Sequence, residues 1–121
     1  MVVNAVGEFV KSYKKHFLYD TDKSWAEPGP GFDTMDLYLP RSPENVIKIG
    51  HGICMDINPW EFKSEFELME FGNYHKDKKC QLIMFSSAWL DPNTYPTDKK
   101  ATDDTINYWA NRLIPIIEDK N

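Results

Sequence analysis

Cys54 is the residue in this sequence best placed to act as a nucleophile. It follows an apolar, β-branched run at residues 46–53 and precedes Asn58 and Pro59, which commonly begin a helix. A thiol between a buried strand and a helix N-terminus meets free backbone N–H groups, which favour a thiolate and stabilise an oxyanion. A cysteine that ends an apolar strand is also common as an inert core residue. Its position alone leaves both interpretations open.

The strands that would carry this cysteine are short and separated by turn residues. Alternating Pro and Gly make residues 19–32 a loop, and its Asp20, Asp22 and Trp25 are candidates for the rim of a site. The predicted strands are residues 2–3, 9–10 continued through 13–18, 46–53 and 81–85.

A helix is predicted directly after the cysteine, over residues 58–71. Asn58 is its expected N-cap, and Glu61 stands where a capping-box carboxylate belongs. Gly72 is expected at its C-terminal cap. The helix would place its positive end close to Cys54.

A second helix is predicted near the end of the chain. Apolar residues recur at helical spacing from about Thr102, with two aspartates in the expected first turn, and Pro115 should end or kink the helix. Residues 91–101, with two prolines, are expected to form a loop. The predicted order β-β-β-α-β-α is that of an α/β protein.

The composition is that of a globular protein with 121 residues, 41% hydrophobic and 14% aromatic. A formal net charge of −5 argues against nucleic acid or an anionic membrane as the main partner. No apolar run is long enough to span a bilayer. Two cysteines form no disulfide framework, so we expect a soluble protein of a reducing compartment with free thiols.

Two segments of the chain resemble one enzyme superfamily. Residues 52–62 (GICMDINPWEF) resemble the nucleophile segment of the carbon–nitrogen hydrolase (nitrilase) superfamily. Residues 13–18 (YKKHFL) resemble its lysine motif, with Lys15 at the catalytic position and Lys14 in place of the usual arginine. The DINPW continuation after the cysteine is most similar to the branch of protein N-terminal amidases, and YDTDKSW and SSAWL also suit that branch. The resemblance extends from about residue 2 to residue 117.

The resemblance implies amide hydrolysis through a thioester. Cys54 would attack the amide carbon, Lys15 and the backbone N–H of Met55 would stabilise the oxyanion, and ammonia would leave. The implied reaction is deamidation of N-terminal asparagine or glutamine of proteins, in the cytoplasmic N-degron pathway. The substrate would be a peptide or a small amide, and no cofactor or metal is expected.

Other residues of these segments are candidates for binding substrate. Asp56, Trp60 and Trp89 are expected to line the pocket, and the Asp56 carboxylate could meet the free α-amine of a peptide. Asp56→Asn would then weaken N-terminal substrates selectively.

The glutamates of the superfamily match this chain poorly. Its general base lies well upstream of the lysine, whereas Glu8 falls in the predicted hairpin turn. A second glutamate orients the lysine; Glu27 is the candidate for it, followed by Glu44. We therefore expect residues 1–121 to be part of one carbon–nitrogen hydrolase domain, an α-β-β-α sandwich incomplete at both ends.

Three alternatives remain open at this point. The chain could be an inactive pseudoenzyme or fragment that keeps the fold without the chemistry. It could belong to another amidase of the superfamily that acts on a small ω-amide, nitrile or carbamoyl compound. Finally, His51, Cys54, His75 and Cys80 have the right types for zinc, although their spacing matches no common finger.

Overall fold

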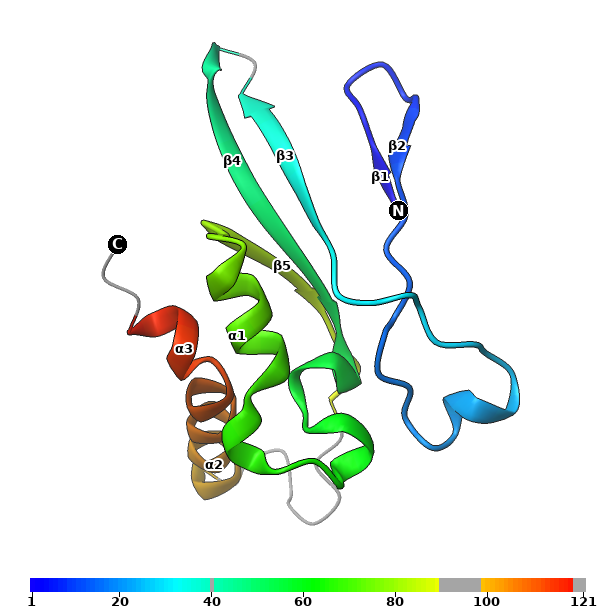
Figure 1. Ribbon diagram of the computed structural model, residues 1–121, viewed down its shortest axis with the longest axis vertical. Helices are drawn as coiled ribbons and strands as arrows, with labels where there is room; N and C mark the ends of the chain where they lie inside the picture. The colour runs from blue at the N-terminus through cyan, green and yellow to red at the C-terminus, as the bar shows by residue number, and fades with distance from the viewer. Residues whose placement is uncertain (40, 90–98, 119–121) are drawn as a thin grey trace.

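A three-stranded mixed sheet forms the centre of the molecule. The computed structural model describes residues 1–39, 41–89 and 99–118. Within these, β3 (Thr34–Leu39) pairs antiparallel with β4 (Ser42–Ile53), and β4 pairs parallel with β5 (Leu82–Ser86). A separate hairpin of β1 (Val2–Val3) and β2 (Phe9–Lys11) lies beyond β3, close to the N-terminus (Figure 1). The α/β class predicted from the sequence is confirmed.

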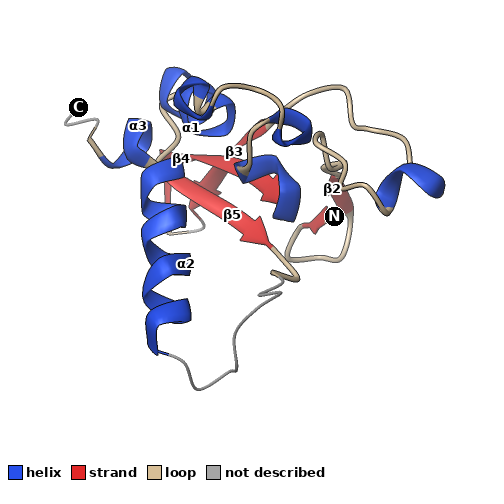
Figure 2. Ribbon diagram, turned by 90° about the horizontal axis from the view of Figure 1, so that it is seen from below, coloured by secondary structure: helices blue, strands red, loops and turns tan. Residues whose placement is uncertain are grey.

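Three helices lie together, away from the hairpin (Figure 2). They are α1 (Glu70–Asp77), α2 (Lys99–Arg112) and α3 (Ile114–Ile117). The aromatic rings of Phe71 on α1 and Trp109 on α2 both contact Phe85 of β5, with centroids 5.8 and 5.0 Å away. Of the helices in the described part of the chain, none combines the length and the apolar character that a membrane span requires.

Two glycines let α1 approach β4 closely. A Cβ at Gly52 would lie 2.6 Å from the ring of Phe71, and a Cβ at Gly50 would overlap the ring of His75. Because side chains alternate along a strand, Ile49 and His51 point to the opposite face of the sheet. Both are nevertheless buried, and His51 stacks on Tyr13 at 5.8 Å between ring centroids.

The face of the sheet away from α1 stays largely open beyond this contact. Leu82 and Met84 stand beside Ile49 and His51 on that face and are 48% and 52% exposed. Leu37, on the neighbouring strand β3, is 38% exposed. One side of the sheet therefore carries a patch of apolar side chains that no helix covers among the described residues.

The prediction of a strand over residues 13–18 is wrong. These residues form no regular structure in the described chain, because their backbone N–H groups find side-chain partners instead of a neighbouring strand. Strand β3 was not predicted, although its TMDLYL stretch alternates in the manner of a strand. The strand predicted at 46–53 begins earlier, at Ser42, and the one predicted at 81–85 is confirmed as β5.

The helix predicted over residues 58–71 is also wrong. The chain instead makes three separate 3-10 turns, Cys54–Ile57, Trp60–Phe62 and Phe66–Leu68, before α1 begins at Glu70. The expected caps have other partners: the amide oxygen of Asn58 accepts from Tyr108, and Glu61 pairs with Lys23 and Lys63. Positive φ at Glu61 and Phe62 distorts the second turn, and positive φ at Met69 separates the third turn from α1.

Gly72 lies inside α1 and does not cap a helix. A Cβ there would come within 2.9 Å of the carbonyl oxygen of Arg112, so glycine allows α1 and the end of α2 to touch. The C-terminal helix begins at Lys99, earlier than predicted, so its aspartates lie beyond the first turn. The predicted break at Pro115 is confirmed, since Leu113 leaves helical geometry and α3 starts anew. Most of the loop predicted at 91–101 lies outside the described residues.

The contact between His75 and β4 predicts an acid-sensitive fold. His75 is 0% exposed, and burial lowers the pKa of its imidazole from 6.5 to about 4. Below pH 6.5 the imidazole is protonated in the unfolded chain but stays neutral in the folded chain. The free energy of unfolding therefore falls as the pH is lowered from 6.5 to about 4. We expect about 2 kcal/mol of unfolding free energy to be lost between pH 7 and pH 5 through this group.

Urea unfolding at both pH values measures this loss, with His75→Gln as the comparison. The variant should lose about 2 kcal/mol of the pH dependence, since glutamine does not titrate in this range, and what remains includes the part from His51, whose pKa burial also lowers. An equal pH dependence in the parent and the variant would contradict the assignment.

Candidate active site

Cys54 stands where β4 ends and the chain turns sharply. Its φ of 47° puts a non-glycine residue in the left-handed region, directly after the extended Ile53. Such backbone strain costs about 1–3 kcal/mol and is typical of functional positions such as the nucleophile on a strand-to-helix elbow. The predicted placement of Cys54 at the end of a buried strand is confirmed. The turn that follows is a single 3-10 turn, however, and not the N-terminus of the long helix that was predicted there.

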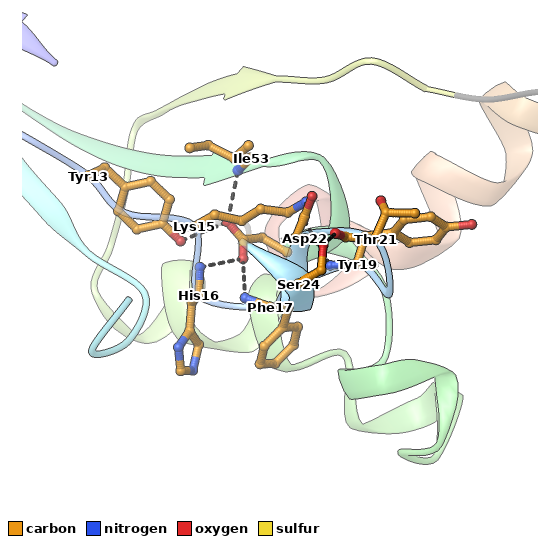
Figure 3. Close-up of polar contacts among 10 residues, drawn as sticks. Tyr13, Lys15, His16, Phe17, Tyr19, Thr21, Asp22, Ser24 and Ile53 are labelled. Carbon is orange, nitrogen blue, oxygen red and sulfur yellow. Dashed lines mark hydrogen bonds and ion pairs between the residues drawn. The ribbon is translucent and has the colours of Figure 1, made fainter. Parts of the chain in front are cut away.

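The Asp56 carboxylate is the centre of the polar network around this turn. It is 0% exposed, and four donors converge on its two oxygens. Oδ1 accepts from the backbone N–H groups of His16 at 3.0 Å and Phe17 at 2.7 Å. Oδ2 accepts from the Tyr13 hydroxyl and the Ile53 backbone N–H, both at 2.8 Å. In Figure 3, Tyr13, His16, Phe17 and Ile53 lie around the carboxylate to which these dashed hydrogen bonds run.

This geometry corrects the prediction that Asp56 binds the α-amine of a substrate. Each carboxylate oxygen already has two donors, and the side chain has no exposed surface. An incoming amine would have to displace bonds that hold the turn together. Burial and the adjacent Asp56 also raise the pKa of Tyr13, so its hydroxyl remains a donor at neutral pH.

Lys15 lies inside the segment that Asp56 holds. Its ammonium pairs with the Asp22 carboxylate, and both side chains are mostly buried (Figure 3). The hydrogen bond from Lys15 lowers the pKa of Asp22, and the backbone N–H of Tyr19 also donates to this carboxylate at 3.0 Å. Asp22 begins a 3-10 turn, Asp22–Ser24, in the loop that the sequence predicted to rim the site.

Glu27 does not hold Lys15, contrary to the prediction. It is exposed on the loop, and Asp22 takes the place beside the ammonium. Glu44 is exposed on β4. The sequence signal that could have found Asp22 is its position seven residues after Lys15, within the same motif that marks the branch. Tyr13 was missed because its partner lies 43 residues away.

The remaining predicted pocket residues lie in different environments. Met55 is buried in the turn after Cys54. Trp60 is 51% exposed on the next turn, while Trp89 packs on α2 against the rings of Tyr108 and Trp109, at 5.9 and 5.1 Å. Their contact with a substrate stays a prediction.

The four residues considered for zinc are divided by the sheet. His75 lies over Gly50 on the α1 side, whereas His51 points to the other face and stacks on Tyr13. Cys80 contacts His75, with 3.5 Å between Sγ and Nδ1. Across residues 1–39, 41–89 and 99–118, no three potential ligands converge on a common point.

Comparison with known proteins identifies relatives of one kind. No family model matches the sequence. A protein N-terminal amidase of Schizosaccharomyces pombe is 38% identical over 91% of this chain, and one of Saccharomyces cerevisiae is 35% identical over 83%. The chain spans only 41% and 24% of the lengths of these two relatives.

Solved structures agree with the sequence relatives. A crystal structure of N-terminal amidase with an Asn-Glu-Ala peptide matches 93% of this chain with a TM-score of 0.68 and 29% identity. A cysteine-to-serine variant of N-terminal amidase matches with a TM-score of 0.67 and 30% identity over the same share. The chain covers 29% of each of these structures. This chain is therefore a homologue of one segment of the protein N-terminal amidases, which are nitrilase-superfamily enzymes.

Proposed function

We propose that this chain carries the nucleophile of a protein N-terminal amidase, which converts N-terminal asparagine or glutamine to the acid. The observation that carries the proposal is the strained Cys54 turn, tied through Asp56 to the segment that holds Lys15. The related structures with Gln-Val and Asn-Glu peptides support a peptide substrate. Two free thiols fit a cytoplasmic location, as the N-degron pathway requires.

The proposed chemistry begins with attack of the Cys54 sulfur on the side-chain amide carbon. The ammonium of Lys15 and the backbone N–H of Met55 stabilise the negative oxygen, and the C–N bond breaks with release of ammonia. Water then cleaves the thioester, which gives the carboxylic acid and restores the thiol. The proton transfers need a general base. Glu8 is assigned no part in them, because it lies in the hairpin turn and pairs with Asn4.

Asp22 takes the role that the resemblance gives to a lysine-orienting glutamate. Its carboxylate forms an ion pair with the Lys15 ammonium, and both side chains are mostly buried. An ammonium that is fixed before the reaction stabilises the oxyanion without paying to reorganise. Trp60 remains a proposed wall of the pocket, since it is half exposed on the turn that follows the cysteine.

The nucleophile is tested with Cys54→Ala and the matched variant Cys80→Ala. Ammonia release from a peptide with N-terminal asparagine should fall by at least about 10³-fold in Cys54→Ala, because the covalent route is lost. Cys80→Ala should keep its activity, since the Cys80 thiol contacts His75 on the α1 side of the sheet. Similar rates in the two variants would contradict the role of Cys54.

The same assay separates the substrate classes when the peptide is compared with its N-acetylated form and a simple linear amide. N-terminal amidase activity requires the free peptide to react fastest. Activity on the simple amide alone would favour the small-amide alternative, and no ammonia from any of the three would favour an inactive relative.

The lysine partner is tested with Asp22→Asn and Glu27→Gln. Asp22→Asn should lower the free energy of unfolding by about 1–2 kcal/mol, because Lys15 and the Tyr19 N–H lose a charged acceptor. It should also lower kcat. Glu27→Gln should leave the unfolding free energy within about 0.5 kcal/mol and kcat unchanged. Denaturant melts measure the unfolding free energy, and ammonia release measures kcat. Larger losses in Glu27→Gln than in Asp22→Asn would show that Glu27 is the partner of Lys15.

We also propose that residues 1–121 are part of one carbon–nitrogen hydrolase domain with an α-β-β-α sandwich. The open apolar face of the sheet supports this, because a second sheet packed on that face would bury Leu37, Leu82 and Met84. In the polypeptide that contains both sheets, Met84→Lys should cost about 2 kcal/mol or more, as it would bury a charge. Ile106→Lys, on the outer helix layer, should cost about 0.5 kcal/mol or less. Equal costs in thermal melts would contradict the sandwich.

A further inference from the structure

One carboxylate supplies the link between the segment that carries Lys15 and the turn that carries Cys54. In the described chain, no backbone–backbone hydrogen bond joins residues 13–18 to residues 53–57. Among the residues that the structure describes, the only backbone–backbone hydrogen bond of residues 13–18 runs to the loop, from the Gly29 N–H to the Lys15 carbonyl oxygen. Asp56 makes the missing connection, because its oxygens accept from both segments.

The four donors to Asp56 lie on both sides of Lys15 and directly before Cys54 in the sequence. His16 and Phe17 are the two residues after Lys15, Tyr13 lies two residues before it, and Ile53 directly precedes Cys54. The same carboxylate therefore holds the backbone that follows the lysine and the Tyr13 side chain that precedes it, and it supports the strained residue of the turn.

The donor pattern requires a carboxylate at this position. An asparagine offers one oxygen, and its NH₂ group would face backbone N–H groups that can only donate. At least one buried donor would lose its acceptor, and the two segments would move apart to reach water. Asparagine has nearly the shape of aspartate, so the substitution tests the hydrogen-bond pattern and the charge without creating a cavity.

We propose that Asp56 is a positioning residue, which sets the place of Lys15 relative to Cys54 through the four donors it accepts from. The inference rests on the proposed function for its kinetic consequence, but its geometric part concerns only the coupling of two side chains. Asp56 does not touch substrate in this proposal. It acts through the backbone of the two segments that it joins.

Steady-state kinetics on a peptide with N-terminal asparagine give the first test, in the full-length protein that contains this chain. Asp56→Asn should lower kcat about 100-fold, which is the loss expected from a displacement of about 1 Å, with KM changed by less than about threefold. Tyr13→Phe removes one donor and keeps the charge, so it should lower kcat about tenfold. Asp36→Asn, whose carboxylate pairs with Lys48 far from the turn, is the matched control and should not change kcat.

A double-mutant cycle on thiol reactivity separates positioning from a merely structural role. The proposed function places the Lys15 ammonium beside the reacting Cys54 sulfur, so Lys15→Ala should slow the alkylation of Cys54 by iodoacetamide at pH 7. If Asp56 sets the position of the lysine, that effect should shrink by at least about threefold in the Asp56→Asn background. Alkylation of the Cys54 peptide is followed by mass spectrometry, with Cys80 replaced by alanine in all variants.

Each outcome decides the proposal. A folded Asp56→Asn that keeps kcat within about threefold, or that changes KM alone, would overturn it, and so would an unchanged effect of Lys15→Ala on alkylation. If Asp56→Asn does not melt cooperatively, Tyr13→Phe decides by the same two measurements. A parent protein that hydrolyses no amide would refute the proposed function, while the alkylation cycle would still decide the role of Asp56.

Discussion

A buried carboxylate must be given donors, and here Asp56 receives four of them from two distant parts of the chain. The cost of removing this charge from water is offset only when residues 13–17 and the Cys54 turn are both in place. The segment that carries Lys15 needs no strand pairing for this reason. Its irregular backbone is fixed by a side chain 40 residues away, which explains how two motifs far apart in sequence share one location.

The buried guanidinium of Arg112 also binds this turn, at its last residue, Ile57. Arg112, 1% exposed, donates to the carbonyl oxygen of Ile57 at 2.7 Å and to that of Phe66, and pairs with Glu70 at 3.2 Å. These bonds fasten the successive 3-10 turns to the end of α2. Asp56 and Arg112 thus both bind the cysteine turn, and Gly72 lets α1 lie against the end of α2 that carries Arg112. A left-handed residue at Cys54 persists because its surroundings determine it.

The sequence predicted the parts of the site that depend on local patterns, and it failed where tertiary contacts replace them. The apolar run before Cys54 and the break at Pro115 are local, and both predictions are confirmed. Asn58 and Glu61 have the types of helix caps, but Tyr108, Lys23 and Lys63 occupy their side chains, so the predicted helix does not form. Asp56 looked like a substrate ligand, because burial and pairing over long distances are invisible in the sequence. Glu27 looked like the partner of Lys15 because it is a glutamate, as in the superfamily, whereas the observed partner is an aspartate seven residues after the lysine.

Amide hydrogen exchange at His16, Phe17 and Ile53 tests most directly whether one carboxylate joins the two segments. His16 and Phe17 lie outside any helix or strand, so the hydrogen bonds to Asp56 are their source of protection. We expect these two amides to exchange as slowly as that of Ile53, and all three to lose protection together in Asp56→Asn. Rapid exchange at His16 and Phe17 beside a protected Ile53 would contradict the link between the lysine segment and the cysteine turn.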